Sequence, residues 1–175
     1  LTVIGNLVSK GEVHIDGQIQ GDLHALQITV GESARVTGGV VADEVRAGRH
    51  PVHIDPMRRW YQLLRSHDYV DVWLISWATS QAAELHDHAG SLGALTVVSG
   101  RLVEQRWTGA GLRTRTLRAG RSAGFPLGHV HDVENRAVEP AVSVHAYSPP
   151  LTAMSYYGVT PEGQIRRTRS ELVTV

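Results

Sequence analysis

Three histidines have the spacing of a metal site. His86 and His88 stand two residues apart in one string, 84–88, and His131 follows in a second string, 128–135. In an extended strand, side chains two residues apart point to the same face of the sheet. The first two imidazoles should therefore converge, and a third from a neighbouring strand would complete a site for iron, zinc, copper or nickel. We predict that His86, His88 and His131 bind one metal ion.

The second string has a wider pattern, G-x5-P-x-G-x2-H-x3-N, which is set by Gly120, Pro126, Gly128, His131 and Asn135. With the H-x-H pair and a hairpin glycine, Gly100, it resembles the two motifs of the cupin barrel. Cupins usually place a glutamate shortly after the second histidine, where this chain has Gly93. The resemblance then implies three neutral ligands, unless a nearby acid folds inward, the candidates being Glu84, Asp87 and Asp132. The H-x3-N spacing selects His131 over His129, which we expect behind the ligands or at the mouth of the site.

Short alternating apolar segments predict the scaffold that would position these residues. Strands are expected at Tyr69–Trp77, Ala94–Val98, Arg101–Trp107, Leu112–Arg118 and Pro140–Tyr147. Glycine-containing turns are expected at 99–100, 109–111 and 119–120. Many short antiparallel strands with even turn spacing indicate an all-β sandwich or barrel.

A short helix should precede these strands. Asp55 suits the N-cap position and Pro56 the first turn. Apolar residues then follow at i, i+3, i+4 and i+7 on one helical face, namely Met57, Trp60, Tyr61 and Leu64. We predict a helix from Asp55 to about Ser66.

The last predicted strand of the barrel separates polar from apolar side chains. Ser143, His145 and Tyr147 share one face, and the opposite face carries Val142, Val144 and Ala146. This alternation indicates that a hydroxyl, an imidazole and a phenol line the interior together.

Several strings resemble the type I cysteine dioxygenase family, which are thiol dioxygenases on a cupin barrel: Glu84–His88, Ser91–Gly93, His131–Asn135 and Glu139–Pro150. The resemblance spans roughly residues 55 to 160, and its S-x-H-x-Y-S-P-P string is more specific than the histidines. By resemblance, the three histidines bind Fe(II), and Ser143, His145 and Tyr147 form a hydrogen-bonded relay beside it. The implied reaction adds both atoms of dioxygen to the sulfur of a small thiol and gives a sulfinate.

Two departures from the family pattern bear on this chemistry. Some members join a cysteine to the active-site tyrosine, but this chain has Gly93 there and no cysteine, so Tyr147 must be a free phenol. Cysteine-specific members also bind the substrate carboxylate with an arginine, and an ungapped match puts Tyr61 at that position, next to Gln62. Nearby arginines are out of register: Arg58, Arg59 and Arg65.

Gln62 and Arg65 are therefore our candidates for substrate binding. A bidentate arginine differs greatly from a glutamine as a partner for a carboxylate. Related enzymes with glutamine in this region use mercapto-carboxylic acids. Cysteine is the first expected substrate, and 3-mercaptopropionate is the alternative.

Residues 1–48 differ in character from the rest of the chain. They contain no aromatic residue, whereas every Trp, Tyr and Phe lies at or beyond Trp60. Segment 19–25 is echoed by 36–42 at an offset of 17, and 5–7 is echoed by 21–23 at about one residue less. A glycine-cornered β-repeat indicates rungs of a β-solenoid. We predict a β-solenoid segment at 1–48 and a cupin domain at 49–175.

The string from Thr2 to Val45 resembles bactofilins, whose β-helix cores polymerise end to end. The string amounts to about three rungs. The resemblance implies self-assembly through residues 1–48. His14 and His24 are expected to be surface residues of a rung and not metal ligands.

Composition narrows the classes of partner. The formal net charge is zero, so no basic field indicates nucleic acid or an anionic membrane. No apolar run reaches the length of a membrane span, no signal-peptide pattern occurs, and the absence of cysteine is compatible with the cytoplasm. Two alternatives to a thiol dioxygenase stay open: a bactofilin-like scaffold with a non-catalytic cupin, and a zinc or nickel cupin with an isomerase or sensing role.

Overall fold

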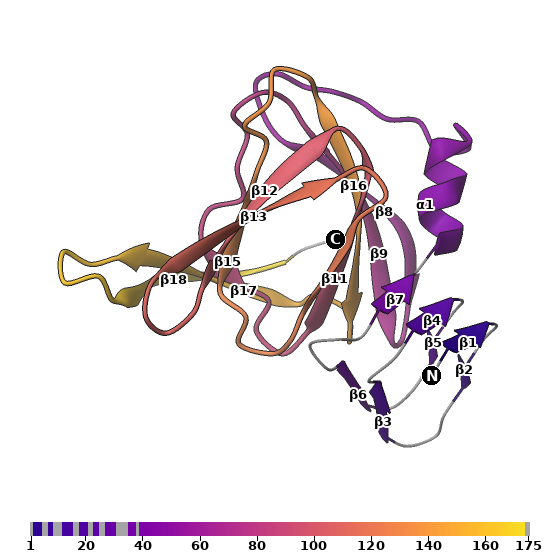
Figure 1. Cartoon of the computed structure of the whole chain (residues 1–175), viewed down its shortest axis with the longest axis horizontal. Coiled ribbons are helices and arrows are strands. Elements are labelled where there is room, and N and C mark those ends of the chain that lie inside the picture. The colour runs from indigo at the N-terminus through magenta and orange to yellow at the C-terminus, as the bar shows by residue number, and fades with distance from the viewer. Residues whose placement is uncertain are drawn as a thin grey trace.

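The computed structural model describes residues 2–4, 7–8, 12–15, 18–20, 23–24, 27–30, 35–37 and 39–173, with side chains from Val41 onward except that of His67. Two antiparallel sheets face each other to form a barrel (Figure 1). The first has the spatial order β13 (Leu112–Arg118), β12 (Arg101–Trp107), β15 (His131–Glu134), β10 (His86–Asp87), β17 (Ala153–Val159) and β18 (Ile165–Leu172). The second has the order β14 (Ser122–Phe125), β11 (Leu92–Ser99), β16 (Ala141–Ser148), β9 (Val70–Trp77) and β8 (Trp60–His67). The predicted all-β barrel is confirmed.

The interior of one half of the barrel is packed with apolar side chains. Its largest buried members are Trp77, Leu95, Val97, Leu102, Phe125 and Val133. They come from strands of both sheets because every second residue of a strand points inward. Each fully buried side chain of this size contributes about 1.5–3 kcal/mol. This core fixes the positions of the strand segments that carry the polar side chains.

The strands expected from sequence all occur, with bounds shifted by two residues or fewer at each end. The expected turns also occur, and Gly100, Gly109, Gly111 and Gly120 have positive φ. At Gly100 a Cβ would lie 2.7 Å from the carbonyl oxygen of Pro140, so glycine is needed there for both backbone conformation and space.

The helix predicted from Asp55 to about Ser66 is wrong. Residues 60–67 form β8, which pairs antiparallel with β9. The register of this pairing has an irregularity between Leu63 and Arg65. Trp60 and Leu64 are four residues apart and pack against the same outer cluster, because residues i and i+4 share a face in a strand as well as in a helix. Asp55 does accept a hydrogen bond from the Met57 amide at 2.8 Å, but it closes a turn instead of starting a helix.

A short helix does precede the barrel, but it is α1, from Gly39 to Arg46 (Figure 1). It packs against the outer face of the five-stranded sheet, on β11 and β16. The contact buries Val41, Ala42 and Val45 against Leu74, Val142 and Val144. The outward-facing valines of β16 are therefore covered by α1, while the alternate residues of this strand point to the interior.

Short parallel strands precede α1. One sheet contains β1 (Thr2–Ile4), β4 (Gln18–Gln20) and β7 (Arg35–Thr37), and two further pairs are β2 (Leu7–Val8) with β5 (Leu23–His24) and β3 (Glu12–Ile15) with β6 (Gln27–Val30). Ile19 pairs with Val36, and Leu7 pairs with Leu23, which are the offsets read from the sequence. The predicted echo stops before residue 42, because α1 begins at Gly39.

β7, the last of these short strands, lies beside β14 of the barrel. The side chains of His14 and His24 lie outside the described residues, so their predicted surface position is not tested. In the described part of the chain, no helix combines the length and the apolar character needed to cross a membrane. The division at residue 48 stays a prediction.

Candidate metal centre

Strand pairing brings the three histidines together. Within the six-stranded sheet β10 lies between β15 and β17, and His86 is directly opposite His131. His88 follows two residues later and is buried with them. The ring centroids are 5.0 Å apart for His86 and His88, 4.8 Å for His86 and His131, and 5.2 Å for His88 and His131. One nitrogen from each ring lies within 4.8 Å of the other two, which makes a compact triplet of donors.

Hydrogen bonds at Nδ1 orient two of the three rings. His86 Nδ1 lies 2.8 Å from the carbonyl oxygen of Glu84, and His131 Nδ1 lies 3.1 Å from a carboxylate oxygen of Glu104. These acceptors place the ring proton on Nδ1 and leave Nε2 with its lone pair. His86 Nε2 is 3.2 Å from His88 Nε2, and His131 Nε2 is buried without a hydrogen-bond partner. A buried nitrogen without a partner is unfavourable in itself, and a metal ion would satisfy it.

Burial keeps the three imidazoles neutral. It lowers the pKa of His86 to about 3 and lowers the pKa of His88 and His131 below the ordinary histidine value. Neighbouring imidazoles act in the same direction on His86 and His88. Because a metal binds only the unprotonated ring nitrogen, the triplet is prepared for ligation at neutral pH.

The nearby carboxylates that could have joined the histidines are engaged elsewhere. The Asp87 carboxylate accepts a hydrogen bond from Tyr157 at 2.6 Å, and Asp132 accepts one from the Ala83 amide at 3.1 Å. The Glu84 carboxylate points away to an arginine, Arg169. The donor set that the structure assembles is therefore all imidazole.

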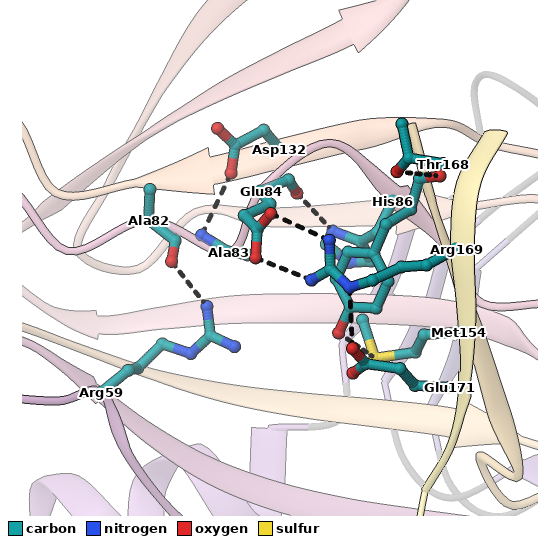
Figure 2. A network of polar contacts seen from close by, with 11 residues as sticks. Arg59, Ala82, Ala83, Glu84, His86, Asp132, Met154, Thr168, Arg169 and Glu171 are labelled. Atoms are coloured by element: carbon teal, nitrogen blue, oxygen red, sulfur yellow. Dashed lines mark hydrogen bonds and ion pairs between the residues drawn. The ribbon is translucent and has the colours of Figure 1, made fainter. Parts of the chain in front are cut away.

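The Glu84 carboxylate forms a bidentate ion pair with Arg169 of β18, at 2.8 and 3.2 Å (Figure 2). The guanidinium also stacks over Tyr156, 3.7 Å from the ring centroid, and that ring lies 6.2 Å from His86. Glu84 has a φ of 66°, an uncommon conformation for a residue with a side chain. The backbone of Glu84 therefore aims its carbonyl at His86 while its side chain is fixed by the C-terminal hairpin.

Glu104 is a member of the site that sequence reasoning missed. It is fully buried on β12, where Oε1 accepts hydrogen bonds from His129 Nε2 at 2.9 Å and from His131, and Oε2 pairs with Arg115. Burial alone would raise the pKa of Glu104, but these donors hold it well below its usual range. The sequence feature that could have identified Glu104 is its inward position on a predicted strand, two residues after the buried Leu102. His129 contacts Glu104 and lies behind His131.

Ser143, His145 and Tyr147 line up on the inner face of β16. Ser143 Oγ lies 2.8 Å from His145 Nε2, and His145 Nδ1 lies 3.3 Å from the Tyr147 hydroxyl. Trp77, on the neighbouring strand β9, donates its indole N–H to Ser143 Oγ at 2.8 Å. Tyr147 reaches the histidine triplet, with its ring centroid 4.8 Å from that of His88.

The indole gives this chain of hydrogen bonds a direction, because an indole N–H can only donate. In the arrangement that uses every donor, the Ser143 hydroxyl then donates to His145 Nε2, and His145 Nδ1–H donates to the Tyr147 oxygen. The phenol proton is left for a partner in the pocket. Burial lowers the pKa of His145 to about 3 and raises the pKa of Tyr147, so both groups are neutral near pH 7.

The predicted substrate residues lie on the other face of the sheet. Gln62 is exposed and pairs with Leu74, whose side chain packs outward against α1. Arg65 is exposed and forms an ion pair with Glu44 of α1 at 3.0 Å. Neither side chain is on the face that carries the relay.

Arg59, immediately before β8, points to the relay instead. It donates to the carbonyl oxygen of Ala82 at 3.0 Å (Figure 2), and its guanidinium lies 4.9 Å from the ring centroid of Trp77. Its charge acts on the ionisation of both His145 and Tyr147, and its Nε is buried without a hydrogen-bond partner. Burial lowers the pKa of Arg59 itself.

Solved structures with the same fold include several cupins. TT1209 from Thermus thermophilus superposes with a TM-score of 0.51 at 22% identity, over 57% of this chain and 90% of that one. An uncharacterised protein with a double-stranded β-helix domain from Klebsiella pneumoniae gives 0.51 at 22% identity, over 56% and 78%. A sugar phosphate isomerase of the cupin superfamily from Silicibacter pomeroyi gives 0.50 at 20% identity, over 68% and 84%. At these identities the likeness shows the fold alone.

Two families match by sequence. The bactofilin family, described as polymer-forming cytoskeletal, matches residues 1–50, in agreement with the resemblance noted above. Cysteine dioxygenase type I matches residues 27–159, which is most of the chain and includes the three histidines and the relay. Both predicted family resemblances are thereby confirmed. The protein is a cupin-type metal-dependent enzyme, and it belongs to the cysteine dioxygenase type I family.

Proposed function

We propose that the protein is an Fe(II) thiol dioxygenase that converts a small thiol carboxylic acid to its sulfinate, with cysteine as the first candidate substrate. The net reaction adds both atoms of O2 to one sulfur, R–SH + O2 → R–SO2H. The observation that carries the proposal is the contact between the His88 ring of the imidazole triplet and Tyr147 of the relay. This contact supports the proposal because it brings the ring of Tyr147 next to one of the predicted metal ligands.

The donor set suits iron. Three neutral imidazoles leave the charge of a divalent ion uncompensated, and a bound ferrous ion would supply affinity for thiolate and reactivity toward dioxygen. Zinc and nickel also accept imidazole, so metal identity is decided by which ion supports turnover.

Tyr147 has the role of hydrogen-bond donor to the reacting atoms. His145 holds the phenol oxygen from behind, which directs the phenol proton into the pocket. Because burial raises the pKa of Tyr147, the proton stays on the phenol at neutral pH. The relay therefore orients one O–H donor and does not supply a base.

Arg59 has the role of the substrate carboxylate partner, in place of Gln62 and Arg65. It is on the same face as the relay, and among the described residues no carboxylate pairs with it. Its Nε and remaining N–H groups match the bidentate geometry of a carboxylate. Cysteine and 3-mercaptopropionate both carry a carboxylate, whereas cysteamine does not, so we place cysteamine last among small thiols.

An oxygen-uptake assay with metal quantified in the same sample tests the activity. Iron-loaded protein should consume one O2 per thiol with cysteine or 3-mercaptopropionate and release the sulfinate, identified by mass spectrometry. His86→Ala should lose both metal and uptake. If iron-loaded protein consumed no oxygen with cysteine, 3-mercaptopropionate or cysteamine, the proposal would be abandoned. Turnover of another reaction with zinc or nickel alone would favour the isomerase alternative.

Matched arginine variants test the substrate partner. Arg59→Met keeps an unbranched stem but removes the guanidinium and its charge, and it should raise KM for cysteine by about tenfold to a hundredfold, the range of a charge-assisted hydrogen bond. Arg65→Met, on the outer face, should leave KM unchanged. Gln62→Ala is a second control. If Arg65→Met or Gln62→Ala raised KM and Arg59→Met did not, the assignment would be wrong.

We also propose that residues 1–48 mediate self-assembly, which is supported by the bactofilin match and the parallel strand pairs. The full-length protein should form large particles in light scattering and filaments in electron micrographs. Small particles of uniform size at all accessible concentrations would contradict this. An assembling protein without thiol-dependent oxygen uptake would indicate the scaffold alternative.

A further inference from the structure

We propose that Glu104 is a positioning residue for the metal ion. In this role it fixes the tautomer and orientation of His131 and makes that ligand a stronger donor than His86 or His88. The inference rests on the proposed metal site and goes beyond it. The carboxylate that cupins usually place among the ligands is absent from the triplet, and Glu104 would supply negative charge through an imidazole instead.

Strand register explains how a carboxylate comes to lie at this position. Glu104 is opposite Val133 on β15 and opposite Arg115 on β13, so all three side chains share the inner face. His131, two residues from Val133, faces the same way. Glu104 is fully buried and His131 is almost so, which excludes water as an alternative partner for their shared hydrogen bond.

Both carboxylate oxygens of Glu104 already have hydrogen-bond donors. Its Oε1 accepts from both His129 and His131, and its Oε2 is taken by Arg115. The cluster of Glu104, His129 and His131 therefore has its donors and acceptors matched internally, unlike the Nε2 atom of His131 on the far side of the ring.

His86 and His131 differ in what stands behind them. His86 Nδ1 faces a neutral carbonyl oxygen, whereas His131 Nδ1 faces a carboxylate. A carboxylate behind an imidazole raises its basicity toward a metal and prevents the ring from flipping. Such partners typically contribute about 10–100-fold to metal affinity.

Aromatic packing holds the pair in place. Phe125 lies 4.1 Å from the His131 ring centroid and stacks on His129 at 5.2 Å. His129 donates a hydrogen bond to Glu104 Oε1, which also accepts one from His131. The carboxylate is therefore fixed from two sides before any metal binds.

The matched variants are Glu104→Gln and Arg115→Met. Both break the ion pair between the buried Glu104 and the exposed Arg115, but only the first removes the carboxylate from His131. Co(II) affinity, measured by chelator competition, should fall about 10–100-fold in Glu104→Gln and less than about threefold in Arg115→Met. The visible spectrum of the Co(II)-loaded protein should change in Glu104→Gln alone. Equal affinities in Glu104→Gln and wild type, or equal losses in the two variants, would overturn the proposal.

A measurement on the unaltered protein covers the case in which Glu104→Gln does not fold. Nitrogen-15 NMR of the metal-free and zinc-loaded full-length chain should show His131 protonated at Nδ1, with a slowly exchanging ring proton. A proton on Nε2 in the metal-free protein would refute the inference. Because Co(II) affinity and tautomer state do not depend on thiol oxidation, loss of the dioxygenase proposal would leave these results intact, and the converse also holds.

Discussion

Gly93 lies directly opposite Tyr147 across the antiparallel pair β11 and β16. A Cβ at Gly93 would be 3.0 Å from His88 Nδ1 and 3.0 Å from Phe125, a separation that requires the neighbours to move. The strand thus approaches a predicted metal ligand so closely that any side chain would press on the ring. The free phenol of Tyr147 and the position of His88 therefore both depend on the absence of a side chain at Gly93.

Gly93→Ala should displace His88 and lower metal affinity by about tenfold, within the range for disturbed ligand support. Overpacking should also reduce the free energy of unfolding by about 1–3 kcal/mol. Gly124→Ala is the control, since Gly124 faces solvent on the adjacent strand β14 and a Cβ there would meet nothing within 4 Å. Chelator competition and denaturant unfolding measure both effects. Wild-type affinity in Gly93→Ala would show that the ring adapts without cost.

Ser143→Ala should lower kcat while metal content stays at the wild-type value. The change leaves the Trp77 indole N–H and His145 Nε2 without their partner, and it should cost about 1–3 kcal/mol of stability. Ser76→Ala is the control, because Ser76 is equally buried on β9 but donates to the carbonyl of His53 at 2.6 Å. Both variants should lose stability, and only Ser143→Ala should lose activity. A wild-type kcat in Ser143→Ala would remove the relay from the mechanism.

The stability of the metal-free protein should decrease in acid partly because of His145. Its pKa is lowered to about 3 by burial, whereas an unfolded histidine titrates near about 6.5. Between these values the unfolded chain binds a proton that the folded chain does not. The stabilisation that neutral His145 gives the folded state is therefore fully present above about pH 6.5 and is lost as pH falls toward 3. In that window the free energy of unfolding should decrease by up to about 1.4 kcal/mol per pH unit.

His145→Gln should flatten the pH dependence of the unfolding free energy in that window, measured by denaturant titration between about pH 4 and 7. Ser76→Ala, a buried change without a titrating group, should keep the wild-type slope. Parallel slopes in wild type and His145→Gln would mean that His145 binds its proton equally well in the folded and unfolded chain.

Arg169→Ala should weaken metal binding more than it weakens the fold. The ion pair with Glu84 is partly exposed, so its loss should cost the fold little. However, the ion pair fixes Glu84, which has a positive φ and whose carbonyl oxygen orients His86. We therefore expect a severalfold loss of metal affinity. Arg166→Ala, on the exposed distal part of the same strand, is the control. Similar affinities in the two variants would limit the role of Arg169 to the surface.

Val45→Ala should destabilise the barrel even though Val45 belongs to the segment assigned to the N-terminal repeats. Its side chain is buried against Leu74 and Val144, and removing two methyl groups should cost roughly 2 kcal/mol. Val52→Ala removes the same atoms from an exposed position and should cost less than about 0.5 kcal/mol. The comparison also tests the division at residue 48, since an independent repeat segment would leave barrel unfolding unchanged.

The sequence predicted the parts of the structure that depend on local periodicity. Strand alternation indicated the barrel, and the H-x-H and H-x3-N spacings identified residues that the fold brings within ligand distance of one another. The helix at 55–66 was wrong because residues four apart share a face in a strand as well as in a helix, as Trp60 and Leu64 do in β8. α1 was read as a rung, although Val41, Ala42 and Val45 already have the spacing of a helical face.

Contacts between distant strands could not be read in this way. The pairing of Glu104 with His131 depends on the register of β12 against β15, which no motif encodes. Similarly, which of Arg58, Arg59 and Arg65 could bind substrate depends on the face of the sheet that each side chain takes, in β8 or just before it. Only the pairing with β9 and the packing of α1 decide this.

The glycine opposite Tyr147 has a consequence for the life of the enzyme. With glycine at this position and no cysteine in the chain, no thioether to the phenol can form during turnover. A newly made molecule should thus work at its full rate from the first substrate it meets, with no maturation phase and no dependence on how often it has already reacted.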